Sequence, residues 1–142
     1  MIYIDTSSLL KLVITDRLST WVELAIASEP MVIVSSLGEL EASVQLRALT
    51  RGGILRPNRV QQVGEKLALI LKSAPFVIRS LSGTVFSSAV TQHEKAKTHC
   101  RSLDRLHLAA MEELQISRLM THDARQAEAA RELGYEVISP GL

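Results

Sequence analysis

The sequence has a single cysteine, 4% aromatic residues and no apolar run of eighteen residues in its 142 positions. The lone Cys100 excludes an internal disulfide and leaves no cysteine pair for a zinc site. The four histidines lack the i, i+4 spacing of a zinc protease, which is further evidence against zinc. Because neither a membrane-spanning run nor a leader-like start is present, the sequence predicts a cytoplasmic protein without a membrane segment.

Composition and charge come next. Hydrophobic residues make up 46% of the chain and charged residues 22%, which is ordinary for a globular protein. We expect one domain spanning residues 1–142. The formal net charge of +1 hides an uneven distribution, because residues 47–105 hold eleven Lys or Arg against three acids, a local net of +8. Such a segment is consistent with a surface that faces nucleic acid, although solvated helix faces carry similar charges.

Strand-like and helix-like segments alternate along the chain. Short β-branched or apolar runs predict strands at residues 1–5, 31–35, 75–80, 116–121 and 135–139. Helical patterns fall at residues 8–14, 18–29, 35–53, 58–72, 83–97, 102–114 and 123–134. In the third helix, Ser36 and Glu39 have capping-box spacing, and Gly52 and Gly53 form the stop. The alternation predicts an α/β fold with a parallel sheet, whose binding sites lie at the carboxyl ends of the strands.

Three aspartates stand at strand carboxyl ends or helix N-termini, and each has an ordinary structural explanation. Asp5 ends the first strand and is placed to cap the next helix. Asp123 follows the fourth strand and has capping-box spacing to Gln126. Asp104 lies in the first turn of its helix, where the helix dipole favours an anion.

Glu41 is harder to explain as a structural residue. On its helix an apolar stripe is formed by Leu37, Leu40, Val44 and Ala48, and Glu41 falls inside that stripe. We therefore expect it to face the core, where an acid needs a partner.

Taken together, the four acids predict a cation site. Carboxylates gathered at one edge of an α/β sheet repel each other unless a cation lies between them. Oxygen ligands of this kind suit Mg²⁺, with Mn²⁺ as a second option. His107, three residues after Asp104, is predicted to be a buried structural histidine, and His122 a loop residue.

Four segments in order resemble the PIN-domain family, specifically the VapC-type toxins of toxin–antitoxin modules: "MIYIDTSSLLKL", "VSSLGELEASVQL", "CRSLDRLHLAAM" and "RLMTHDARQAEAARELGYEVISPG". The resemblance runs from Met1 to Gly141. It implies a single PIN-like α/β/α sandwich with a central parallel sheet. The acidic quartet that it implies is Asp5, Glu41, Asp104 and Asp123, with Thr6 and Thr121 as supporting residues. Glu39 is an alternative to Glu41 that the spacing disfavours.

What the resemblance implies about activity is a metal-dependent endoribonuclease that cleaves RNA phosphodiesters by metal-activated water. A homodimer and a cognate antitoxin are the implied protein partners. From their places beside Asp104, Arg101 and Arg105 are predicted to contact the RNA backbone. Aromatic residues are too scarce for a stacking platform, which favours recognition of RNA shape.

Two other functions fit parts of the sequence. An aspartate after the first strand is also the nucleophile of aspartyl-phosphate phosphotransferases and phosphatases, but "DTSS" lacks the second aspartate of the phosphatases. A non-catalytic module that binds RNA or a protein partner is the other alternative. Four acids at the expected binding edge favour the enzyme over both.

Overall fold

A parallel sheet of five strands forms the centre of the computed structural model, which describes residues 1–140. The strand order is β3-β2-β1-β4-β5, and every neighbouring pair is parallel. All five strands lie within the runs that the sequence predicts, so the α/β class is confirmed. Their bounds are β1 (Ile2–Ile4), β2 (Val32–Ser35), β3 (Phe76–Arg79), β4 (Arg118–Met120) and β5 (Glu136–Ile138).

The helices also fall close to their predicted places. Gly52 caps the third helix, and Gly53 takes a positive φ of 69° that suits a residue without a side chain. Gly134, with a φ of 83°, follows the last helix. The bounds are α1 (Thr6–Leu9), η1 (Leu10–Leu12), α2 (Ser19–Ala27), α3 (Ser36–Arg51), α4 (Pro57–Leu71), α5 (Thr84–Lys95), α6 (Ser102–Glu113) and α7 (Ala124–Glu132).

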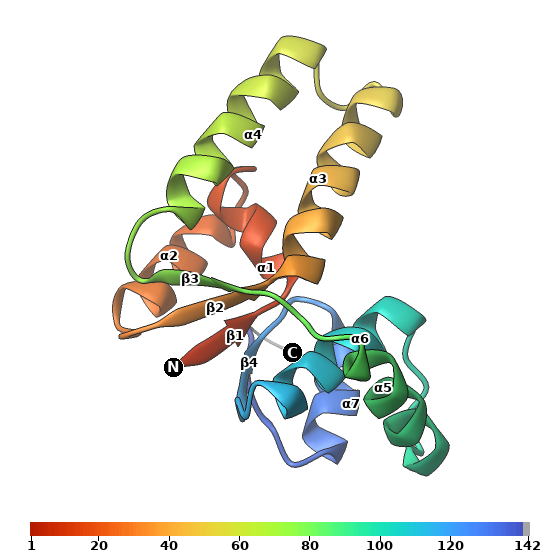
Figure 1. The fold of residues 1–142 in the computed structure, drawn as a ribbon. Coiled ribbons are helices and arrows are strands. Elements are labelled where there is room, and N and C mark those ends of the chain that lie inside the picture. The colour runs from red at the N-terminus through yellow and green to blue at the C-terminus, as the bar shows by residue number, and fades with distance from the viewer. Residues whose placement is uncertain (141–142) are drawn as a thin grey trace.

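Alternation along β1 places helices on both faces of the sheet. Successive side chains of a strand point to opposite faces. Ile2 and Ile4 accordingly pack in a core with residues of α1 to α4, whereas Tyr3 packs in a second core with residues of α5 to α7. The result is the expected α/β/α sandwich (Figure 1).

The start of the first helix and the cap of the third differ from the prediction. The first helix begins at Thr6 rather than Ser8, because Asp5 caps it by accepting the N–H of Ser8. The cap of α3 is Ser35 rather than Ser36, and its hydroxyl accepts the N–H of Gly38. In both cases the cap is the residue that directly follows or ends a strand.

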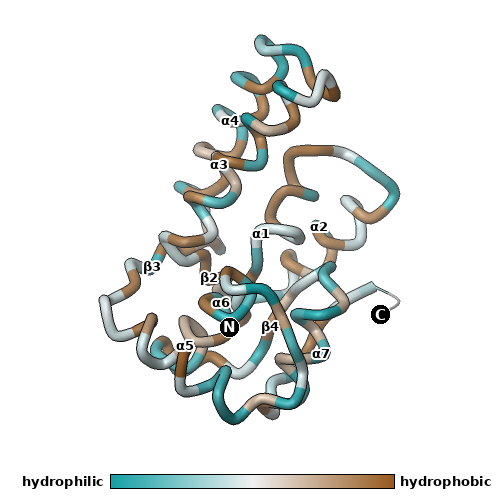
Figure 2. The backbone as a smooth tube through the Cα atoms, turned by 90° about the vertical axis from the view of Figure 1, so that its right-hand side faces the viewer, coloured by the Kyte–Doolittle hydropathy of each residue, from teal (hydrophilic) through white to brown (hydrophobic). Residues whose placement is uncertain are grey.

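Helices α3 and α4 form an arm that extends beyond the sheet (Figures 1 and 2). The prediction of which face of α3 is buried is wrong. Its buried face consists of Gly38, Ala42 and Leu46, whereas Leu40 is 62% exposed and Val44 is 58% exposed. The reason is that α3 turns the face with the small residue Ala42 toward the core, which leaves the larger apolar stripe uncovered.

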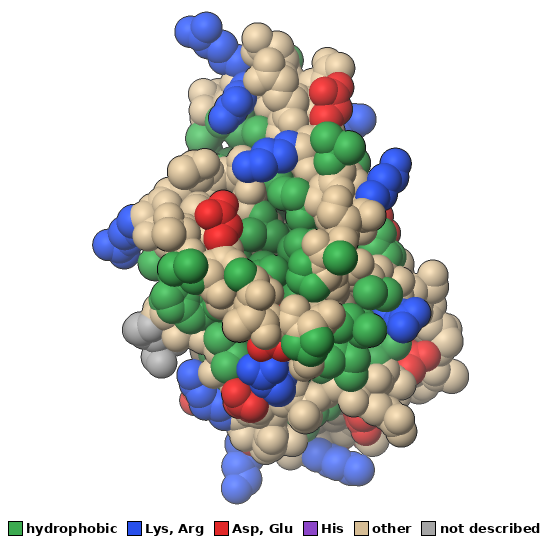
Figure 3. All heavy atoms as spheres, turned by 90° about the vertical axis from the view of Figure 1, so that its left-hand side faces the viewer, with side chains coloured by type: hydrophobic (Ala, Val, Ile, Leu, Met, Phe, Trp, Pro, Cys, Tyr) green, Lys and Arg blue, Asp and Glu red, His purple; other side chains and the backbone are tan. Residues whose placement is uncertain are grey.

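Charged side chains are spread over the surface. In the face shown in Figure 3, Lys and Arg side chains lie along the arm at the top and around the base of the molecule.

The connection between α5 and α6 is held by Glu132 of α7, which accepts the N–H groups of Lys97 at 2.6 Å and Thr98 at 2.7 Å. Among residues 1–140, no helix is long and apolar enough to cross a bilayer.

Candidate active site

The four acids singled out from the sequence line one cavity of about 570 Å³ at the carboxyl edge of the sheet. Parallel strands end at the same edge, which brings together residues far apart in the chain. The cavity lies at the end of β1, the central strand, which has β2 and β3 on one side and β4 and β5 on the other. Its acids come from four segments, namely Asp5 after β1, Glu41 of α3, Asp104 of α6 and Asp123 before α7.

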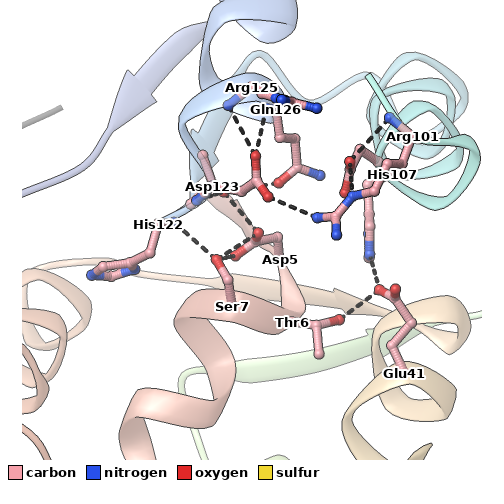
Figure 4. Close-up of polar contacts among 12 residues, drawn as sticks. Asp5, Thr6, Ser7, Glu41, Arg101, His107, His122, Asp123, Arg125 and Gln126 are labelled. Carbon is pink, nitrogen blue, oxygen red and sulfur yellow. Dashed lines mark hydrogen bonds and ion pairs between the residues drawn. The ribbon is translucent and has the colours of Figure 1, made fainter. Parts of the chain in front are cut away.

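Asp5 is the most buried of these acids, with 4% of its surface exposed. Its carboxylate accepts a hydrogen bond from the Ser7 hydroxyl at 2.8 Å (Figure 4). It also accepts the Ser8 N–H at 2.9 Å and the Thr121 hydroxyl at 2.7 Å. Burial raises the pKa of Asp5 above its ordinary value, and these hydrogen bonds oppose the rise. Within residues 1–140, this carboxyl is therefore held in position by hydrogen bonds and forms no ion pair.

Asp123 combines a capping role with a place in the cavity. Its Oδ1 accepts the N–H groups of Arg125 at 2.9 Å and Gln126 at 3.0 Å, which caps α7 as predicted. Its Oδ2 lies 2.8 Å from Nη2 of Arg101. The cap uses only one oxygen, so the other remains directed at the cavity.

Arg101 bridges two of the acids. Its Nε lies 3.0 Å from Oδ2 of Asp104, which also accepts the Arg101 backbone N–H at 3.2 Å. Together with the contact to Asp123, this places the guanidinium between acids of two different elements. The Arg101 side chain is nevertheless 69% exposed, so it can leave this position without disturbing the core.

Glu41 has partners that the sequence did not reveal. Its Oε2 accepts the Thr6 hydroxyl at 2.8 Å and lies 2.5 Å from Nε2 of His107. Burial raises the pKa of Glu41, but the hydrogen bonds from His107 and Thr6 outweigh it and hold the pKa below its ordinary value. Glu41 therefore faces the cavity as a half-buried carboxylate. Glu39 is exposed and does not line the cavity.

Arg105 does not reach the cavity. Only 4% of its surface is exposed, and its Nη2 donates to the backbone carbonyl of Thr98. The expectation that it contacts an RNA backbone conflicts with this burial. Arg101 and Arg105 are four residues apart on adjacent turns, yet only Arg101 points at the acids.

One wall of the cavity is apolar. It includes Leu37, Leu40 and Val44 of α3 and Leu103 of α6. Leu40, Val44 and Leu103 are exposed, which is unusual for large apolar side chains grouped at one site. The stripe expected to face the core thus borders the acidic cavity.

The residues of the cavity suit a hard divalent cation in their chemistry. All four acids supply oxygen, and Cys100 does not line this cavity. Among residues 1–140, no three His, Cys, Asp or Glu side chains converge closely enough to hold a metal ion. The guanidinium of Arg101 lies between Asp104 and Asp123, so a cation at this place requires that Arg101 move away.

Comparison with known proteins agrees with this fold. The PIN domain family matches residues 2–132. The chain therefore belongs to the PIN-domain family, as the four segments of the sequence indicate.

Within that family the similar curated proteins are VapC ribonucleases of Mycobacterium tuberculosis. Ribonuclease VapC35 (strain ATCC 25618 / H37Rv) is 32% identical over 150 residues, covering 99% of this chain and 98% of that protein. Ribonuclease VapC47 (strain CDC 1551 / Oshkosh) is 29% identical over 148 residues, with the same coverage. The VapC type inferred from the sequence is confirmed.

Solved structures show the same fold. The crystal structure of Mycobacterium tuberculosis VapC20, described as a Sarcin-Ricin loop cleaving toxin, superposes with a TM-score of 0.73 at 18% identity, covering 99% of this chain and 100% of that one. FitAcB from Neisseria gonorrhoeae superposes with a TM-score of 0.72 at 20% identity, covering 97% and 96%. At these identities the similarity concerns the fold alone.

Proposed function

We propose that this protein is a metal-dependent endoribonuclease that acts as the toxin of a toxin–antitoxin pair. The observation that carries the proposal is that four carboxylates from four distant segments line one cavity of a VapC-type PIN fold. A scaffold without catalytic work has no need for four acids at one edge of its sheet. The ribonuclease names of its relatives support the same reaction.

The roles of the residues follow from their positions. Four acids would hold Mg²⁺, or Mn²⁺ in its place, if the Arg101 guanidinium moved out, namely Asp5, Glu41, Asp104 and Asp123. A divalent cation held there would lower the pKa of water and neutralise negative charge on the phosphate. Thr6 and Thr121 keep the carboxylates of Glu41 and Asp5 in place through the hydrogen bonds described above.

Arg101 has a second role in this proposal. After it leaves the acids, its long and exposed side chain remains at the rim of the cavity, where an RNA phosphate would lie. A guanidinium binds phosphate oxygens through paired N–H donors. The basic residues along the arm supply further phosphate contacts without base specificity.

The exposed apolar wall of the cavity supports the proposal that the protein binds protein partners. We infer that an antitoxin segment packs on Leu40, Val44 and Leu103, which places it over the acids and blocks RNA. Phe86 and Val90 of α5 are exposed as well and suit contact with a second copy of the chain. Light scattering of the purified protein, alone and with its antitoxin, measures both associations.

The test is RNA cleavage by wild-type protein and by Asp5→Asn with Mg²⁺ and with a chelator. We expect cleavage with 5′-phosphate ends that the chelator abolishes, and a loss of at least about 100-fold in Asp5→Asn because a carboxylate ligand is removed. Asp16→Asn, which changes an exposed aspartate outside the cavity, is the matched control. A non-catalytic binding module would retain RNA in both variants and cleave it in neither.

A further inference from the structure

A chain of hydrogen bonds runs from Glu41 into the interior of the protein. Nε2 of His107 lies 2.5 Å from Oε2 of Glu41, and Nδ1 of the same ring lies 2.7 Å from the Tyr3 hydroxyl. That hydroxyl lies 2.6 Å from Oγ of Ser35. Tyr3, Ser35 and His107 are almost completely buried. The hydrogen-bonded partners are far apart in sequence. The separation is 66 positions between Glu41 and His107, 104 between His107 and Tyr3, and 32 between Tyr3 and Ser35.

The chemistry of the two ends sets the direction of the chain. A Glu41 carboxylate only accepts hydrogen bonds, so Nε2 of His107 is the donor. With Nδ1 as acceptor, the Tyr3 hydroxyl donates a hydrogen bond to the ring and accepts one from the Ser35 hydroxyl. Every member of the chain is then satisfied.

The chain ties Glu41 to the start of its own helix. Ser35 caps α3 by accepting the N–H of Gly38 at 3.2 Å, and Glu41 lies further along the same helix. The ring of His107 also packs edge-on to Tyr3, with centroids 5.7 Å apart. Elements β1, β2, α3 and α6 are thereby held together at the cavity wall, and both ring nitrogens of His107 have a partner there.

We propose that Ser35, Tyr3 and His107 are positioning residues that fix the carboxylate of Glu41 for cation binding, with His107 Nε2 as the contacting donor. The inference rests on the proposed function, since it assigns Glu41 to the cation. A charge-assisted hydrogen bond to a carboxylate in a buried setting is stronger than a neutral one and restricts its geometry. Without it, Glu41 is left with the hydroxyl of Thr6 as its one described partner.

The test compares His107→Gln with His107→Asn. The side-chain amide of glutamine can reach the position of Nε2 and donate to Glu41, whereas that of asparagine ends near Nδ1. We expect Mn²⁺ affinity, measured by calorimetry on metal-free protein, to fall about tenfold in His107→Asn and to stay within about threefold of wild type in His107→Gln. In RNA cleavage we expect kcat to follow the same order with KM unchanged. His99→Asn, at an exposed position outside the acid cavity, is the matched control.

Tyr3→Phe provides a test that does not replace His107. It removes one hydroxyl two steps from Glu41 and keeps the ring, and we expect Mn²⁺ affinity to fall about threefold. Mn²⁺ affinities equal to wild type in folded His107→Asn and Tyr3→Phe, or equal losses in the Gln and Asn variants, overturn the inference. Wild-type protein that binds Mn²⁺ without cleaving RNA contradicts the proposed function alone, because the affinities of the variants still test the chain.

Discussion

Replacing Arg101 with alanine should strengthen cation binding while weakening RNA cleavage. The guanidinium lies where it neutralises Asp104 and Asp123, so an incoming cation competes with it. Each exposed ion pair of this kind is worth about 0.2–1 kcal/mol. Two pairs give about 0.4–2 kcal/mol, which corresponds to a gain in Mn²⁺ affinity of about twofold to thirtyfold.

The assay is a calorimetric titration of metal-free protein with Mn²⁺, paired with a thermal melt. Metal-free Arg101→Ala should melt at a lower temperature than wild type, because two neighbouring carboxylates lose their counter-ion. Added Mn²⁺ should raise its melting temperature more than that of wild type. RNA cleavage should fall, because the variant lacks the guanidinium that is proposed to bind phosphate.

Arg125→Ala is the matched control for charge. Arg125 contacts Asp123 only through its backbone N–H, which an alanine keeps. Among residues 1–140 its guanidinium forms no ion pair, unlike that of Arg101. Its removal should change Mn²⁺ affinity less than removal of Arg101. Unchanged or weaker Mn²⁺ binding by Arg101→Ala would refute the reasoning, since the cation would then not occupy the place of the guanidinium.

Three further predictions follow from particular contacts. Glu41→Gln should lose most RNA cleavage and Glu39→Gln little, because only the first side chain lines the cavity; equal losses in a cleavage assay would contradict this assignment. Thr121→Val should lower the free energy of unfolding by about 1–3 kcal/mol in urea titrations, because the buried Asp5 carboxylate loses a donor. Hydrogen bonds from the connection after α5 lower the pKa of Glu132 from 4.5 to about 2. Its contribution to stability is therefore complete above pH 4.5 and is lost as the pH falls toward 2, so Glu132→Gln and wild type should converge in urea midpoints on acidification.

Local patterns in the sequence account for the elements and for the edge of the sheet that carries the acids. Runs of β-branched residues predict each strand, and the cap at Asp123 follows from spacing within one helix turn. These signals depend on neighbours in the chain, which a single sequence displays. The buried face of α3 is not displayed by the sequence in this way, because it depends on which of two possible faces packs against the rest of the core.

Long-range pairs are what the sequence could not reveal. The contact of His107 with Tyr3 joins positions 104 residues apart, and no spacing rule covers that distance. The burial of Arg105 is a second case. It lies four residues after the exposed Arg101, but its burial depends on the connection at Thr98, whose carbonyl it contacts. A signal for His107 was present, because a histidine on the buried side of a helix that starts with a site acid needs a polar partner.

The acids of the cavity are spread from residue 5 to residue 123, and the last of them begins α7. A ribosome that makes this chain therefore produces an incomplete pocket for most of the time of synthesis. If the protein cuts RNA as proposed, cleavage becomes possible only after Asp123 has been made and α7 has folded. A chain that ends before Asp123 lacks one of the four acids of the cavity.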